Sequence, residues 1–155
     1  MMKQKLHIIY IIYTAAVALL LSSCTSMVEL ATPLGISLSV DETAKLDRIN
    51  ANKVRIKDDY GQTVMLHRIK REQLSDEDIG RAILDSARAH GMDLKTVEPK
   101  KIAADGLKGV FIIGNGKILS GFIAEGTADG YFMDISYDNS LHDEAVTTAG
   151  SVKKK

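Results

Sequence analysis

The sequence predicts an α+β fold, in which a mostly antiparallel sheet packs with two amphipathic helices. Short runs that alternate apolar and polar residues, such as 36–40, indicate strands with one buried face. Asn115-Gly116 between two apolar runs is typical of a β-hairpin, because both central positions of its turn require positive φ. Segments 74–90 and 139–152 instead place their apolar residues on one helical face. The order of strands, helix, antiparallel meander and helix indicates a layered α+β domain.

The N-terminal half is expected to contain a strand followed by a hairpin. Residues 36–40 alternate cleanly and form the first strand. Residues 53–58 and 62–70 alternate again, and Asp59-Tyr60-Gly61 between them supplies a turn. The intervening segment 41–52 is ambiguous and is compatible with a short helix capped by Asp41.

The strongest helical pattern runs from Leu74 to His90. Ser75 is a suitable N-cap, and the acids at 76–78 lie at the positive end of the helix dipole. Gly91 follows at the position where a C-terminal glycine is expected. The predicted buried stripe consists of Ile79, Ala82, Ile83, Ser86, Ala87 and His90.

The C-terminal half is expected to form a meander and a closing helix. Residues 94–98 are compatible with a short strand that ends before Pro99. Longer strands are predicted at 108–113, 117–125 and 131–137, the second with apolar groups on both faces, as in a covered central strand. Asn139 or Ser140 caps the final helix, whose stripe is Leu141, Ala145, Val146, Ala149 and Val152, and Lys153, Lys154 and Lys155 lie at its negative end.

Two local features accompany this order of elements. Gly150-Ser151-Val152-Lys153 closes the chain after an amphipathic helix, and Leu107-Lys108-Gly109 precedes a long hairpin. Over residues 94–155 the chain resembles the PsbP-like family of small exported domains. The resemblance implies a PsbP-like layered domain that binds partners or assists assembly outside the cytoplasm. The N-terminal half is short for that family.

The first 24 residues have the organisation of a secretory signal. Lys3 and Lys5 precede an apolar run from Ile8 to Leu21. The next residues complete Leu21-Ser22-Ser23-Cys24, which resembles a bacterial lipobox. The resemblance implies cleavage between Ser23 and Cys24 and attachment of lipid, such as palmitate, at the Cys24 thiol. The alternative is an ordinary signal peptide with an incidental cysteine.

This motif divides the chain into a signal peptide at 1–23, a lipidated N-terminus and tether at 24–34, and a single α+β domain at 35–155. In the enterobacterial lipoproteins that it resembles, aspartate after the cysteine retains the protein at the inner membrane. Thr25 stands there instead, so the resemblance favours an anchor in the outer membrane of the cell envelope.

Composition excludes several classes of function. Loss of the signal removes Lys3 and Lys5 but no acid, so 18 basic residues remain against 20 acidic ones, unlike a nucleic-acid binder. Cys24 is the single cysteine, and once lipidated it leaves no thiol for a disulfide, a thiolate metal site or a nucleophile.

The histidines do not indicate a metal site by their spacing. His67, His90 and His142 share no helical metal spacing, and a zinc site would require tertiary contact between them. His90 is expected to stabilise a helix C-terminus, whereas the other two are expected to be exposed.

Two further patterns have ordinary structural interpretations. Gly114-Asn115-Gly116-Lys117 lacks the Ser or Thr of a phosphate loop and fits a hairpin turn. A calcium site remains an alternative for a group of acids close in sequence, although each also suits a turn, strand or helix start. These acids are Asp129, Asp134, Asp138, Asp143 and Glu144.

These observations lead to two hypotheses on function. The first is a membrane-anchored, non-enzymatic binding or assembly domain, with no cofactor or metal, which contacts lipid through acylated Cys24 and an unknown envelope protein. The second is an extracytoplasmic small-molecule carrier or hydrolase that uses a cleft on the sheet. A cleft that holds Asp134 or His67 with a strongly perturbed pKa would favour the second hypothesis.

Overall fold

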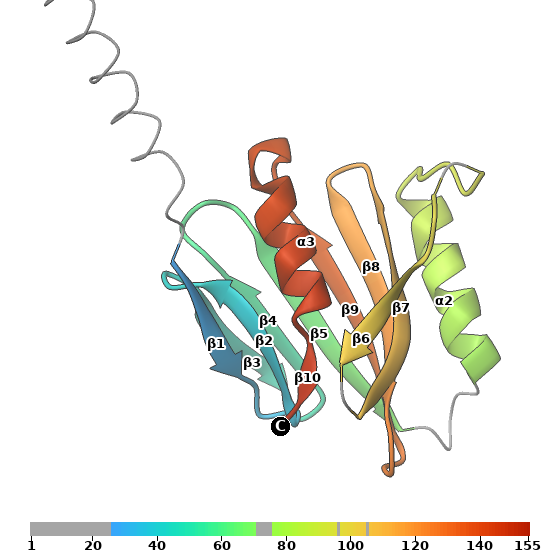
Figure 1. Cartoon of the computed structure of the whole chain (residues 1–155), viewed down its shortest axis with the longest axis horizontal. Coiled ribbons are helices and arrows are strands. Elements are labelled where there is room, and N and C mark those ends of the chain that lie inside the picture. Colours follow the sequence, from blue (N-terminus) through green and yellow to red (C-terminus); the bar gives the residue numbers. More distant parts are fainter. Residues whose placement is uncertain (1–25, 71–75, 96, 105) are drawn as a thin grey trace, which may run out of the picture.

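The computed structural model describes residues 26–155, apart from 71–75, 96 and 105. The predicted α+β fold is confirmed (Figure 1). The elements in chain order are β1 (Met27–Ala31), β2 (Ile36–Asp41), β3 (Lys45–Asn50), β4 (Lys53–Lys57), β5 (Thr63–Lys70), α2 (Asp76–Ala89), β6 (Lys100–Ala104), β7 (Leu107–Gly114), β8 (Lys117–Ala124), β9 (Asp129–Ser136), the 3₁₀ turn η2 (Asn139–Leu141), α3 (His142–Gly150) and β10 (Lys153–Lys154).

The strands form two antiparallel sheets. The large sheet has seven strands in the order β3-β4-β5-β9-β8-β7-β6, and the small sheet has the order β1-β2-β10. Both predicted hairpins are present, β4 with β5 and β7 with β8. Asn115 and Gly116 have φ values of 50° and 67°, as the predicted turn requires. The second hairpin therefore brings β8 to its expected central position, between β7 and β9.

The small sheet corrects two predictions. The predicted tether at 24–34 includes strand β1, which pairs with β2 from Met27↔Asp41 to Ala31↔Ser37. The last lysines do not lie at a helix end, because β10 pairs with β2 through Lys153↔Ser37. Both segments are too short or too polar to show a period of two, and β2 recruits them as neighbours.

Three local predictions are also wrong. Segment 41–52 contains strand β3 rather than a helix, since pairing with β4 supplies its backbone partners. The carboxylate of Asp41 instead accepts hydrogen bonds from the amide and hydroxyl of Thr43 at 2.8 and 2.6 Å. The strand expected at 94–98 begins only at Lys100, after Pro99, which has no N–H to donate. The final helix has Leu141 at its N-cap, after the turn η2, and no side-chain cap.

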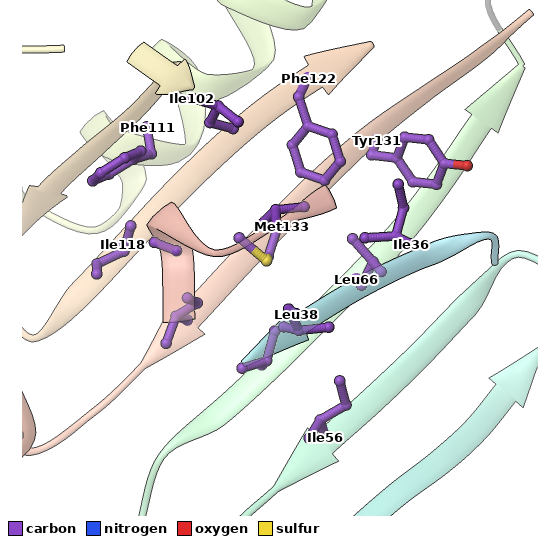
Figure 2. Packing of buried hydrophobic residues seen from close by; sticks show 14 of the residues in the cluster. Ile36, Leu38, Ile56, Leu66, Ile102, Phe111, Ile118, Phe122, Tyr131 and Met133 are labelled. Carbon is purple, nitrogen blue, oxygen red and sulfur yellow. The ribbon is translucent and has the colours of Figure 1, made fainter. Parts of the chain in front are cut away.

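The main core lies between the small sheet with α3 and the inner face of the large sheet (Figure 1). Figure 2 shows Ile36 and Leu38 of β2 against Leu66 and Met133 of the large sheet. All four side chains are at most 1% exposed. A sheet of three short strands needs a packed hydrophobic face to be stable, and burial of this face against the large sheet supplies it.

Helix α2 packs on the opposite face of the large sheet. Ile79, Ile83 and Ala87 of the predicted stripe are buried against Ile112 and Leu119. The exposed Ala82 and His90 lie outside this contact. The expected capping residue Ser75 lies outside the described residues. At the other end, Gly91 has φ 68° and Met92 donates to the Ala87 carbonyl at 3.0 Å, which confirms the glycine stop.

Candidate functional site

One face of the large sheet is covered by α2 over β8 but not over the strands beyond β9. Cross-strand registers align the outward side chains of these strands in rows, for example Lys57↔Thr63↔Ser136 and Lys53↔His67↔Phe132. We call this surface the open face. Its outward residues are Lys45, Asp47, Lys53, Arg55, Lys57, Thr63, Met65, His67, Ile69, Lys117, Phe132, Asp134 and Ser136.

The open face carries positive charge. Its outward side chains include five lysines or arginines and two aspartates, in a mature chain whose predicted net charge is slightly negative. Arg55 binds Asp47 at 2.8 Å, and Lys117 binds Asp134 at 3.1 Å. Within the described residues, Lys53 and Lys57 form no ion pair. The unbalanced charge therefore concentrates along β4.

Apolar side chains lie between these charges. Met65, Ile69 and Phe132 are each half-buried rather than fully covered. Phe132 also packs against the hydrophobic cluster beneath α2, so it lies where the part of the sheet that α2 covers ends. The solvated face of an antiparallel sheet is ordinarily polar. Apolar groups bordered by cations give this face the mixed character of a contact surface.

His67 lies in the middle of the open face. Partial burial lowers the pKa of its imidazole, and the neighbouring charge of Lys53 lowers it further. Both causes disfavour the imidazolium, so His67 is neutral at pH 7. As predicted, the side chain is exposed.

A groove of about 380 Å³ lies beside α2, between the helix and strands β6 to β8. Its wall consists of Ile79, Gly80 and Ile83, and its other residues are Lys101, Ile102, Lys108, Gly109, Val110, Gly121, Phe122 and Ile123. A Cβ on Gly121 would overlap Ile79 and Ile83, so this glycine lets the helix approach β8 closely. The groove is thus a consequence of glycine positions that no motif in the sequence marked.

A second, polar cavity of about 600 Å³ lies at the Asn115-Gly116 turn. Here the hydroxyl of Tyr137 and Nδ1 of His142 are 3.1 Å apart. Burial raises the pKa of the Tyr137 hydroxyl. The side-chain amide of Asn115 donates to the carbonyls of His90 and Gly91 at 3.2 and 2.8 Å. The Gly-Asn-Gly-Lys segment is therefore a hairpin turn that holds the end of α2.

The other candidate residues do not converge. His90 Nδ1 lies 2.7 Å from the Ser86 carbonyl at the end of α2, as predicted for a helix C-terminus. As predicted, His142 is exposed at the start of a helix, and its Nδ1 also lies 3.1 Å from the Tyr137 hydroxyl. Asp134 and His67 line neither of the two cavities. Within the described ranges, no three His, Cys, Asp or Glu side chains gather as a metal site requires.

The predicted anchor lies outside the described residues. Leu21-Ser22-Ser23-Cys24 and the apolar run before it belong to segment 1–25. No helix in the described part of the chain is long and apolar enough to cross a membrane. The lipidation of Cys24 and the cleavage after Ser23 therefore stay predictions.

Comparison with known proteins supports the fold. No family model and no curated protein matches this chain. A similar solved structure is that of cyanobacterial PsbP (CyanoP) from Synechocystis sp. PCC 6803 in solution. Its TM-score is 0.51 at 11% sequence identity, over 86% of this chain and 95% of that one. The two proteins share a PsbP-like fold, and the likeness extends well beyond residues 94–155.

Proposed function

We propose that this chain is a lipid-anchored, non-enzymatic binding domain of the bacterial cell envelope that docks an acidic protein surface on its open face. The observation that carries the proposal is that Lys53 and Lys57 on β4, which form no ion pair within the described residues, lie next to half-buried apolar groups. Complementary charge steers partners and selects among them, while apolar side chains contribute the burial. The PsbP-like fold is consistent with a binding or assembly role.

The proposed lipid anchor would determine where in the cell the open face is held. Lipid on Cys24, at the outer membrane and facing the periplasm, would hold the domain near other envelope proteins. Strand β1 begins at Met27, so the link between the cysteine and the folded part is much shorter than the expected tether. Two or more acyl chains anchor a protein stably, since each buried methylene contributes about 0.8 kcal/mol.

The hydrolase alternative has one observation in its favour, the contact between Tyr137 and His142. A nucleophilic hydroxyl requires a lowered pKa or a base that removes its proton. Burial moves the pKa of Tyr137 in the opposite direction. The contact therefore suits a protonated phenol better than a nucleophile, and the binding function is the better supported of the two.

The open face can be tested in cells with the full chain. A photoreactive amino acid at Met65 should cross-link an envelope protein with an acidic surface, whereas the same group at the exposed Glu98 should not. Charge reversal at Lys53 and Lys57 should abolish the cross-link. The matched control reverses Lys100 and Lys101, two exposed lysines on the distant edge strand β6, and should leave it unchanged.

Three outcomes would contradict this proposal. Cross-links to membrane lipid or to a second copy of the chain would identify another occupant of the open face. Equal cross-linking after charge reversal at Lys53 and Lys57 would remove the electrostatic argument. Cross-links from Glu98 to the same protein would show that the contact is not specific to the face.

The anchor is tested separately. Cells that express wild-type chain or Cys24→Ser are labelled with a fatty-acid analogue. The wild type should carry the label, and the variant should be unlabelled and either unprocessed or soluble. Label on the variant would show that Cys24 is not the lipidation site, without affecting the argument for the open face.

A further inference from the structure

Gly80 has no evident structural reason to be glycine. It lies inside α2, and its φ is not positive. Among the described residues, nothing beyond its neighbours and the helix's own backbone lies within 4 Å of the position that a Cβ would occupy. Glycine is among the least favourable residues in a helix interior, and alanine the most favourable. An alanine would therefore fit and would stabilise the helix, so the glycine weakens α2 without any packing benefit.

The space beside Gly80 is the groove between α2 and strands β6 to β8. A side chain at position 80 would project into this space. The groove is lined mainly by aliphatic groups, with Val110 and Ile123 opposite Ile83. Leu84, one turn after Gly80, is also exposed and extends the apolar surface along the helix. The volume of the groove, about 380 Å³, falls within the range of small-molecule sites.

Two lysines border this apolar surface. Lys108 binds Glu125 at 2.7 Å, so its charge is already partly balanced. Lys101 on β6 is exposed and forms no ion pair within the described part of the chain. Because Lys101 pairs with Val110 in the sheet, its side chain leaves the sheet on the same face as the groove. The groove thus combines an aliphatic lining with the exposed cation of Lys101 at its rim.

We propose that this groove binds an amphiphile with a single acyl chain and an anionic head. The chain lies along α2 over Val110 and Ile123, and the head contacts Lys101. Glycine at position 80 keeps the groove open for the chain. This site is separate from the open face and does not depend on the partner proposed for that surface.

The test uses membranes that contain the full chain, without the cofactors that activate fatty acids. The probe is a ten-carbon fatty acid with a diazirine near the end of its chain. After irradiation and trypsin digestion, the label should be concentrated in peptide 109–117, which contains Val110. Unlabelled decanoate should compete with the probe, whereas decyltrimethylammonium, which has the same chain and the opposite charge, should not.

Variants separate groove occupancy from folding. Gly80→Leu should reduce labelling of peptide 109–117 at least tenfold without lowering Tm. Gly150→Ala, at the end of α3 and away from the groove, is the control for helix propensity and should keep the label. Lys101→Glu should weaken competition by decanoate at least tenfold, whereas Lys100→Glu on the other face of β6 should have little effect.

The proposal is overturned if the label is spread over the chain with no preference for peptide 109–117. Full labelling of Gly80→Leu would likewise exclude the groove. Equal competition by decyltrimethylammonium, or an unchanged response of Lys101→Glu, would exclude recognition of an anionic head. Because Gly80→Leu is expected to fold at least as well as wild type, a loss of label with unchanged Tm cannot be attributed to unfolding.

Discussion

The hydroxyl of Tyr131 donates a 2.8 Å hydrogen bond to the backbone carbonyl of Leu34. Both residues are almost fully buried, and the bond joins strand β9 of the large sheet to the turn that begins β2. The ring of Tyr131 also stacks on Phe122, with centroids 5.2 Å apart. The side chain of Tyr131 therefore links the small sheet to the large one by a hydrogen bond, in addition to the shared core.

Replacement of this tyrosine by phenylalanine should lower the free energy of unfolding by about 1–3 kcal/mol, since the carbonyl of Leu34 loses a buried donor while the ring stays in place. Denaturant unfolding followed by circular dichroism measures the change. Tyr60→Phe, at an exposed tyrosine, is the control. Equal midpoints for Tyr131→Phe and wild type would show that the bond contributes nothing.

The same tyrosine predicts an alkaline response. Burial raises the pKa of Tyr131, with a further contribution from Asp129. A raised pKa in the folded state means that stability is fully present below the unfolded value of about 10 and is lost as pH rises through the folded value. The fall in stability above pH 10 should be smaller in Tyr131→Phe than in wild type.

Gly121→Ala should separate α2 from the sheet. A Cβ at this position would overlap the side chains of Ile79 and Ile83, and overpacking of this kind costs about 1–3 kcal/mol. Gly80→Ala, on the helix itself, meets no neighbour among the described residues and should instead raise the stability by up to about 1 kcal/mol. Thermal melts of the two variants should therefore shift in opposite directions. A shift in the same direction would contradict the close approach of α2 to β8.

Asn115→Asp tests the link between the hairpin and the end of α2. Aspartate tolerates the left-handed turn, but its carboxylate would face the carbonyls of His90 and Gly91, to which the amide now donates. We expect a loss of about 1–3 kcal/mol at pH 7. The loss should shrink below the ordinary aspartate pKa of about 3.9, where the protonated acid can donate.

Gly116→Val isolates the turn itself. A β-branched residue at φ 67° costs about 1–2 kcal/mol, and its Cβ would also lie 3.0 Å from the Tyr137 carbonyl. Asn115→Asp and Gly116→Val should both lower the melting midpoint, but the effect of Gly116→Val should not depend on pH. An unchanged midpoint for Gly116→Val would contradict the two-residue turn.

Lys53→Gln should raise the pKa of His67. Burial remains as the larger cause of the lowered pKa, so the value should move toward 6.5 without reaching it. An NMR titration of the imidazole measures the shift, with Lys57→Gln on the same strand as the control. Because the folded pKa lies below the unfolded one, stability is lost as pH falls below about 6.5, and the variant should lose less of it. An identical titration in both variants would exclude Lys53 as a cause.

Several elements were predictable because local rules agree with the final structure. The β7–β8 turn depends on two residues that accept positive φ, and Asn115-Gly116 satisfies it without tertiary help. The stripe of α2 also follows from spacing alone, as the buried Ile79, Ile83 and Ala87 show. The glycine stop at Gly91 is equally local.

The open face and the groove could not be predicted in this way. Apolar and polar residues alternate along strands β4 and β5, but this pattern does not predict which face of the sheet a helix will cover. The cations of β4 become a surface feature only because α2 packs over β8 instead. The groove likewise depends on Gly121, which admits the helix, and on Gly80, which leaves the space beside it empty.

The sequence by itself determined the α+β class, both main hairpins, the buried stripe and glycine stop of α2, and the resemblance of the first 24 residues to a lipoprotein signal. These depend on residues near one another in the chain, whose turn angles, caps and periodicity act locally. Only the tertiary structure decided that 27–31 and Lys153–Lys154 complete a second sheet around β2. Such short segments carry little preference of their own, and they become strands because the exposed edges of β2 offer unpaired backbone donors and acceptors.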